Sequence, residues 1–212
     1  MKKPEIKAFF QRLSEGDPHP QTELQYINVY TLLVAVVLSA QATDKGVNKA
    51  TEKLFQVADT PEKMLKLGIG RLTDHIKTIG LFRTKAKNVM ELSRLLIERH
   101  GGEVPRTQSE LEALPGVGRK TANVVRNVVF GEPTIAVDTH IFRVSNRTGL
   151  AVGKNVVEVE ERLLKVIPET YRMHAHHWLI LHGRYVCMAR KPLCFTCKVA
   201  DLCHFKAKTT TA

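Results

Sequence analysis

Four cysteines lie close together near the end of the 212-residue chain, spaced so that six, two and five residues separate them: Cys187, Cys194, Cys197 and Cys203. Thiolates are soft ligands that bind either zinc or an iron-sulfur cluster. Four-cysteine zinc sites usually pair two CxxC motifs, whereas only Cys194 and Cys197 are so spaced here. The wider gaps favour an iron-sulfur cluster. Zinc binding and scattered buried thiols are the alternatives.

The amine of Lys120 is a second group that could do chemistry. It follows a glycine turn in "ALPGVGRKTANVV" and falls in the first turn of an expected helix. A helix N-terminus disfavours cations, and Arg119 and partial burial are expected to act in the same direction. A neutral amine is a nucleophile that forms Schiff bases. The alternative is that Lys120 only contacts a phosphate.

The turn itself, with Gly116 and Gly118, predicts a helical hairpin whose backbone N–H groups point at one anion, such as a DNA phosphate. A nucleotide-binding P-loop is excluded, because Arg119 follows the last glycine and Ala113 stands where the first glycine is required. The loop before Cys194 carries Lys191, which either contacts phosphate or lies in a solvated basic loop.

Asp138 stands directly before "THIFRV" and is an N-cap on sequence alone, although a carboxylate there could also stabilise positive charge in a transition state. Another stretch, "YRMHAHHWLILHGRY", holds four histidines. No carboxylate lies at a helpful spacing beside them, so packing or a DNA-facing role is favoured over a metal site. These histidines are His174, His176, His177 and His182.

Helical periodicity dominates the elements that must position these groups, and the expected fold class is all-α. "LLVAVVL" predicts a buried helix that is too short to span a membrane. Thr60-Pro61 predicts a helix start, and the extended stretch 132–140 a domain boundary. The 32 Lys and Arg against 21 acidic residues, a formal charge of +11, favour a polyanionic partner. The charged N-terminus predicts no signal peptide, hence a reducing cytoplasm.

Several motifs occur together in a known order. "VLSAQATD", "ALPGVGRKTANVV", "VDTHIFRV" and the cysteine spacing resemble the endonuclease III family of helix-hairpin-helix DNA glycosylases over nearly the whole chain. The resemblance implies two helical domains with the DNA site in the cleft between them. Residues 22–131 would form a six-helix barrel domain with the hairpin at residues 107–130. Residues 1–21 plus 132–212 would hold a 4Fe-4S cluster on the four cysteines.

The resemblance also implies a function in base excision DNA repair. The enzyme would remove oxidised pyrimidines from double-stranded DNA and cleave the abasic site by β-elimination through a Lys120 Schiff base, assisted by Asp138. Gln41 and Leu81 would fill the gap left by the flipped nucleotide, although the residues alone favour a helix-terminal glutamine and a core leucine. Further DNA contacts are expected from the hairpin and the cysteine loop: Gly116, Gly118, Arg119 and Lys191.

Two other functions stay open from the sequence. The first is a mismatch-specific iron-sulfur glycosylase of the same superfamily, and the second is a non-catalytic DNA-binding module. If the protein is a base excision repair enzyme, we expect a monomer that binds damaged or abasic duplex DNA. We also expect it to associate with the bacterial nucleoid in the cytoplasm and to have no membrane partner.

Overall fold

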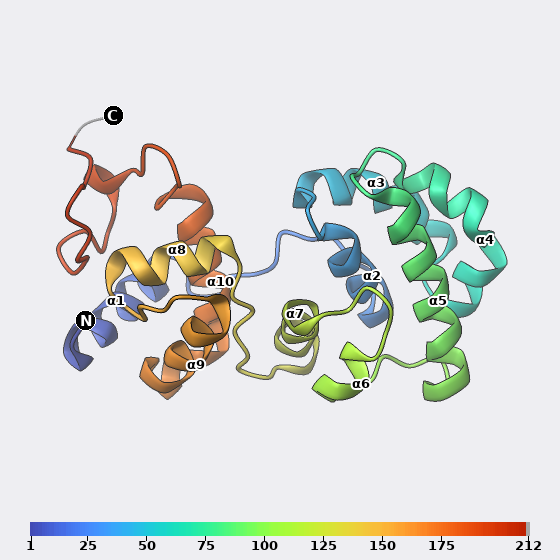
Figure 1. The fold of residues 1–212 in the computed structure, drawn as a ribbon, viewed down its shortest axis with the longest axis horizontal. Coiled ribbons are helices and arrows are strands. Elements are labelled where there is room, and N and C mark those ends of the chain that lie inside the picture. The colour runs from blue at the N-terminus through green and yellow to red at the C-terminus, as the bar shows by residue number, and fades with distance from the viewer. Residues whose placement is uncertain (211–212) are drawn as a thin grey trace. The chain divides into compact units, whose positions relative to one another are not determined.

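The computed structural model describes residues 1–210, and helices are the only regular elements in that range. The expected all-α class is therefore confirmed. The chain divides into two compact units, which we call the central unit, Thr22–Phe130, and the terminal unit, Met1–Gln21 with the chain from Gly131 onward (Figure 1). Among the described residues, no helix combines the length and apolarity that a membrane crossing requires.

The central unit is built around one apolar helix. α2 begins after Asn28, whose side chain accepts the N–H of Thr31, and every residue from Tyr30 to Leu38 is buried. The prediction of a buried helix is confirmed, because the neighbouring helices cover α2 on all sides. The helices of this unit are α2 (Val29–Ser39), α3 (Asp44–Val57), α4 (Pro61–Ile76), α5 (Phe82–His100), α6 (Gln108–Glu112) and α7 (Arg119–Phe130).

Helix α4 begins where the sequence predicts. Thr60 is its N-cap and accepts the N–H of Lys63, and Pro61 occupies the first helical position, where a missing N–H costs nothing. The helix kinks at Gly68, whose φ of 81° is not helical. Beyond the kink α4 packs along α5 and completes the face of the unit away from α7 (Figure 1).

The terminal unit combines the two ends of the chain in one core. Phe9 and Phe10 of α1 are fully buried and share this core with Trp178 and Leu179 of α10, so the blue helix α1 of Figure 1 lies among the yellow to orange elements. The elements of this unit are α1 (Lys3–Gly16), α8 (Thr139–Thr148), α9 (Val156–Val166), α10 (Glu169–Tyr185) and the short 3-10 helix η1 (Cys194–Thr196).

Helices α8 and α10 approach closely because of a glycine. A Cβ at Gly183 would lie 2.8 Å from Cβ of His140 and 3.2 Å from its carbonyl carbon and oxygen. No side chain fits at that distance, so Gly183 allows α10 to lie against the N-terminal turn of α8. This approach sets the position of the residues that follow Asp138.

Candidate active site and cysteine centre

The hairpin of the central unit is held by three buried side chains at intervals of three residues. Leu111, Leu114 and Val117 are 0, 3 and 5% exposed, respectively. The turn is closed by the N–H of Leu114, which donates to Leu111 O at 3.1 Å, and by that of Val117, which donates to Leu114 O at 3.0 Å. With these residues turned inward, the remaining turn residues Gly116 and Gly118 are exposed.

The two glycines of the hairpin have different roles. Gly116 has a φ of 79°, and a Cβ there would lie 2.9 Å from Nδ2 of Asn88 and 3.1 Å from Cγ1 of Val37. Both its conformation and its surroundings therefore require glycine. A Cβ at Gly118 would meet no atom within 4 Å, so this position is open toward solvent.

Lys120 lies in the first turn of α7 and is exposed, as is Arg119. The expected partial burial of Lys120 is wrong. The buried face of α7 begins at Ala122, and the two cations precede it, immediately beyond the open Gly118. The Lys120 amine is therefore accessible to a large ligand next to the exposed backbone of the hairpin.

Three residues other than glycine have a positive φ in the described chain, and each of them is a predicted DNA contact: Gln41 at 55°, Leu81 at 58° and Lys191 at 48°. All three are exposed. A left-handed conformation costs a bulky L-residue about 1–2 kcal/mol, and such strain concentrates at functional sites. The strain at these three positions therefore supports a functional role that does not depend on the resemblance.

Gln41 and Leu81 lie on neighbouring loops of the central unit. A Cβ on Gly80, the residue before Leu81, would lie 3.9 Å from the carbonyl oxygen of Gln41. Leu81 is 60% exposed, so the interpretation as a core leucine is wrong. It occupies the N-cap position of α5, where the left-handed backbone points the side chain outward. The unit thus presents an apolar and an amide side chain on adjacent loops.

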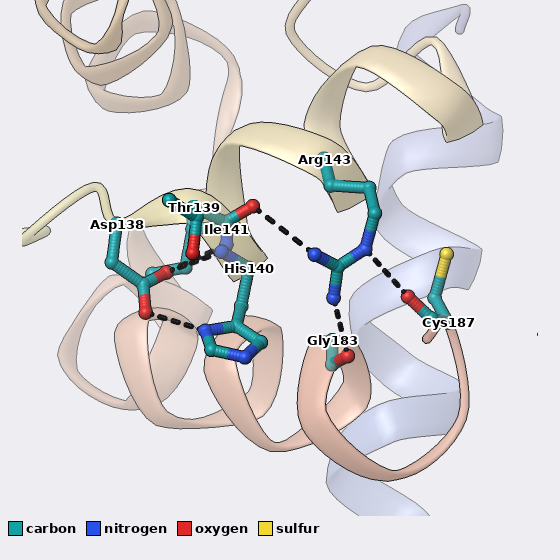
Figure 2. A network of polar contacts seen from close by, with 7 residues as sticks. All are labelled: Asp138, Thr139, His140, Ile141, Arg143, Gly183 and Cys187. Atoms are coloured by element: carbon teal, nitrogen blue, oxygen red, sulfur yellow. Dashed lines mark hydrogen bonds and ion pairs between the residues drawn. The ribbon is translucent and has the colours of Figure 1, made fainter. Parts of the chain in front are cut away.

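Asp138 is the N-cap of α8, as the sequence predicts. Its Oδ1 accepts the N–H groups of His140 at 2.9 Å and Ile141 at 2.8 Å, and its Oδ2 lies 2.7 Å from Nδ1 of His140 (Figure 2). The Asp138 side chain is only 11% exposed. Hydrogen bonds of this kind fix the Asp138 side chain in one orientation.

Sequence reasoning missed Arg143, which connects α8 to the first cysteine. Its Nε donates to Cys187 O at 2.9 Å and its Nη2 to Gly183 O at 2.7 Å (Figure 2). These carbonyls belong to the C-terminal end of α10 and the residues after it, where carbonyls lack helical partners. The signal in the sequence is the pair of arginines at i and i+4, Arg143 and Arg147, on one face of α8.

The four cysteines are half-buried, carry no disulfide and line one cavity together with Arg147, His182 and Phe205. Three of their sulfurs have a nitrogen nearby. Nη1 of Arg147 lies 3.8 Å from Cys187 Sγ, Nε2 of His182 lies 3.8 Å from Cys197 Sγ, and the Phe205 N–H donates to Cys203 Sγ at 3.4 Å. Such contacts stabilise thiolate sulfur.

The chemistry of this cavity fits a polynuclear centre. Burial raises the pKa of the Cys197 and Cys203 thiols, so bound cationic charge is needed to keep them ionised at neutral pH. Within residues 1–210, no group of three or more His, Cys, Asp or Glu side chains is arranged to hold a metal ion. The four cysteines nevertheless line one cavity, as the ligands of a polynuclear centre must.

The residues after Cys203 cover this cavity, which the sequence did not indicate. The Cys194 N–H donates to Thr209 Oγ1 at 3.1 Å, Lys208 Nζ donates to Cys203 O at 2.7 Å, and Arg147 lies over the Phe205 ring at 4.9 Å. We call residues 204–210 the covering segment. Lys191 lies on the loop between Cys187 and Cys194 and is exposed.

The four histidines of α10 pack inside the terminal unit. The rings of His176 and His177 lie 5.1 Å apart, and His174 contacts Trp178 at 5.6 Å. Burial lowers the pKa of His177 to about 4, and burial also lowers that of His182 to about 4. Both rings are therefore neutral at pH 7, as buried imidazoles are expected to be.

Comparison with known proteins identifies a common family. Residues 34–169 match a family model described as HhH-GPD superfamily base excision DNA repair protein. Endonuclease III of Haemophilus influenzae is 64% identical over 197 residues, covering 93% of each chain. Endonuclease III of Escherichia coli K12 is 59% identical over 208 residues, covering 98% of this chain and 99% of that one.

Solved structures give the same result at the level of the fold. A trapped endonuclease III–DNA covalent intermediate superposes with a TM-score of 0.90 at 45% identity, covering 96% of each chain. A thermostable thymine-DNA glycosylase superposes with a TM-score of 0.82 at 26% identity, covering 95% of this chain and 96% of that one.

Proposed function

Because the chain belongs to the endonuclease III family of base excision repair proteins, we propose that Lys120 is its nucleophile and that Asp138 is the carboxylate that assists it. The activity of the family, excision of a base by a DNA glycosylase that also cleaves abasic sites, is the activity of this protein. A non-catalytic binding module is not favoured. The observation that carries the residue assignment is the accessible amine of Lys120, two residues after the open Gly118 of the hairpin.

The Lys120 amine attacks C1′ of the damaged nucleoside. Its lone pair forms the new N–C1′ bond while the glycosidic bond breaks and its electron pair leaves with the base, which takes up a proton. The nitrogen loses one proton, its lone pair forms the C=N bond as the C1′–O4′ bond of the sugar ring breaks, and O4′ takes up a proton, which gives the Schiff base. Loss of a proton from C2′ then expels the 3′ phosphate and breaks the strand. A relative solved as a covalent intermediate with DNA supports this route.

Asp138 is the carboxylate that we propose acts on the reacting nucleotide. Its two main-chain bonds and its contact with His140 hold its side chain in one orientation, so it is preorganised before DNA arrives. A fixed carboxylate stabilises the positive charge that develops on the sugar as the base departs. It also accepts the proton that the amine loses.

DNA is held by the exposed backbone of the hairpin and by the strained loops. The N–H groups near Gly116 and Gly118 and the cations Arg119 and Lys191 contact phosphates. Gln41 and Leu81 enter the duplex and replace the nucleotide that is flipped out. Their adjacent loops, their exposure and their left-handed backbone support this role.

The four cysteines hold a 4Fe-4S cluster. The donor set is all thiolate, the cavity is common to the four side chains, and N–H groups contact three of the sulfurs. When bound, the cluster supplies a rigid cross-link of the loop and a redox-capable centre. Arg147 and the covering segment hold the loop in place, and Arg143 ties Cys187 to the helix that Asp138 caps.

The damaged bases are oxidised pyrimidines in double-stranded DNA, and the protein acts as a monomer. The family membership supports the substrate class, because identity to the two endonuclease III relatives is 59–64% and identity to the solved thymine-DNA glycosylase is 26%. The formal charge of +11 supports the choice of nucleic acid as partner.

The test uses borohydride trapping on duplex DNA that contains one abasic site. Lys120→Gln removes the nucleophile and keeps length and hydrogen bonding, so it should bind this DNA as the parent does but form no trapped adduct and cut no strand. Lys66→Gln, the same change at an exposed lysine of α4, is the matched control and should trap at the parent's rate.

The outcomes separate the hypotheses. A trapped adduct with Lys120→Gln at the parent's rate means that another amine is the nucleophile. Binding without any cleavage by the parent protein means a non-catalytic module. Iron and sulfide analysis tests the centre, and stoichiometric zinc without sulfide in protein prepared without air contradicts the cluster.

A further inference from the structure

His182 occupies a special position on α10. Its ring is 8% exposed and lines the cavity of the four cysteines, with Nε2 3.8 Å from Sγ of Cys197. On another side the ring meets Phe9 of α1, edge to face, with centroids 6.3 Å apart. The imidazole therefore lies between the apolar core of the terminal unit and Sγ of Cys197.

The main chain of His182 forms hydrogen bonds with the start of the cysteine loop. Its carbonyl oxygen accepts the N–H of Cys187 at 2.7 Å and that of Val186 at 3.0 Å. These bonds begin the cysteine loop, and they do not involve the ring. A substitution of the side chain can therefore change the contact with Cys197 and leave the start of the loop unchanged.

Among the nitrogens near the sulfurs, that of His182 belongs to a buried side chain, and the main-chain N–H of Val199 is a second hydrogen-bond partner of Cys197. The donor near Cys203 is a main-chain N–H, and that near Cys187 belongs to Arg147, which also donates to the Met188 and Ala189 carbonyls. A thiolate sulfur can only accept, so the ring nitrogen that faces it carries the proton. His182 is thus the side chain that can alter one sulfur without breaking the loop.

We propose that His182 donates its Nε2–H to Cys197 Sγ and thereby raises the reduction potential of the cluster. The inference rests on the cluster proposed above. A hydrogen bond withdraws electron density from a thiolate ligand and favours the state with one more electron. Because His182 is buried and Cys197 is half-buried, solvent screens the effect only in part. His182 is a positioning residue that acts through Cys197 and contacts no substrate.

The experiment compares two substitutions in the full-length protein loaded with its cluster. His182→Phe keeps a planar ring against Phe9 but has no donor, and its reduction potential, measured by voltammetry, should shift to a more negative value. His182→Gln places an N–H group near the former Nε2 and should recover most of the shift. His177→Phe removes an equally buried histidine of α10 and is the matched control. It should leave the potential at the parent's value.

A second measurement uses the unsubstituted protein, in case His182→Phe loads poorly. With 15N in the histidine rings, pulsed electron paramagnetic resonance of the cluster, brought to a paramagnetic oxidation state, should detect a coupled ring nitrogen that is lost in His182→Gln. Absence of that coupling in the parent, or a fully loaded His182→Phe protein with the parent's potential, overturns the inference. Zinc in place of iron and sulfide in the parent overturns the cluster itself, so the two failures are distinguishable.

Discussion

Replacing Gly116 by alanine should destabilise the hairpin of the central unit without removing a catalytic side chain. At φ 79° an alanine costs about 1–2 kcal/mol relative to glycine. The new methyl group would lie 2.9 Å from Asn88 Nδ2 and 3.1 Å from Asn88 Cβ and from Val37 Cγ1. Overpacking of this kind costs about 1–3 kcal/mol. We therefore expect the central unit to lose about 2–5 kcal/mol of stability.

The assay must report on the central unit alone. The single tryptophan, Trp178, lies in the terminal unit, so its fluorescence follows the other part of the chain. Hydrogen exchange of peptides from α6 and α7 follows the hairpin directly. A loss of 2–5 kcal/mol corresponds to exchange that is faster by about 30- to 5,000-fold where exchange proceeds through unfolding of the unit.

Gly118→Ala is the control for this prediction. Its Cβ would meet nothing within 4 Å and its φ is not positive, so protection of α7 should be unchanged or slightly increased. Binding to duplex DNA should weaken instead, because the methyl group lies where we propose that phosphate approaches. Equal loss of protection in the two variants, or no loss in Gly116→Ala, refutes the assignment of separate roles.

Three further predictions concern the terminal unit. Asp138→Ala should lower stability by about 1–2 kcal/mol in thermal unfolding, because the N–H groups of His140 and Ile141 lose their acceptor. Asp138→Asn should keep the stability of the parent but lose base release. Equal destabilisation by the two variants contradicts this prediction. Burial lowers the pKa of His177 and of His182 from 6.5 to about 4, so between these values the unfolded chain binds protons that the folded chain does not, and the free energy of unfolding should fall by about 3 kcal/mol per histidine as pH drops through this window. His177→Phe should remove about half of this dependence, and an unchanged curve would contradict the assignment. Removal of the chain after Cys203 should accelerate loss of visible absorbance to an iron chelator, and an unchanged rate would mean that the covering segment does not protect the centre.

Local patterns predicted the parts of the molecule that local contacts determine. The N-cap at Asp138, the start of α4 and the buried α2 follow from residues within one or two turns of each other, and the structure confirms them. The hairpin is similar, because Leu111, Leu114 and Val117 lie within seven residues. The catalytic and metal-binding roles of the predicted residues stay predictions.

Contacts between distant segments could not be predicted in this way. Arg143 donates to the carbonyl of Cys187, 44 residues away, and no residue near Arg143 in the sequence indicates that partner. Leu81 illustrates the opposite error: its transfer free energy favours the core, but the left-handed turn before α5 holds it outside. Lys120 is exposed because the core face of α7 begins only at Ala122, a register that periodicity fixes less well at helix ends.

The core shared by α1 and α10 determines the order in which the molecule can be assembled. α1 has 14 residues and two phenylalanines that need a core, yet their partners Trp178 and Leu179 are synthesised more than 160 residues later. A helix of this length is marginal in water by itself. The central unit is continuous in sequence, so it can fold during synthesis, before the core partners of α1 have been made. The cysteines are synthesised later still, so the proposed cluster would be delivered to a chain whose central unit can already be folded.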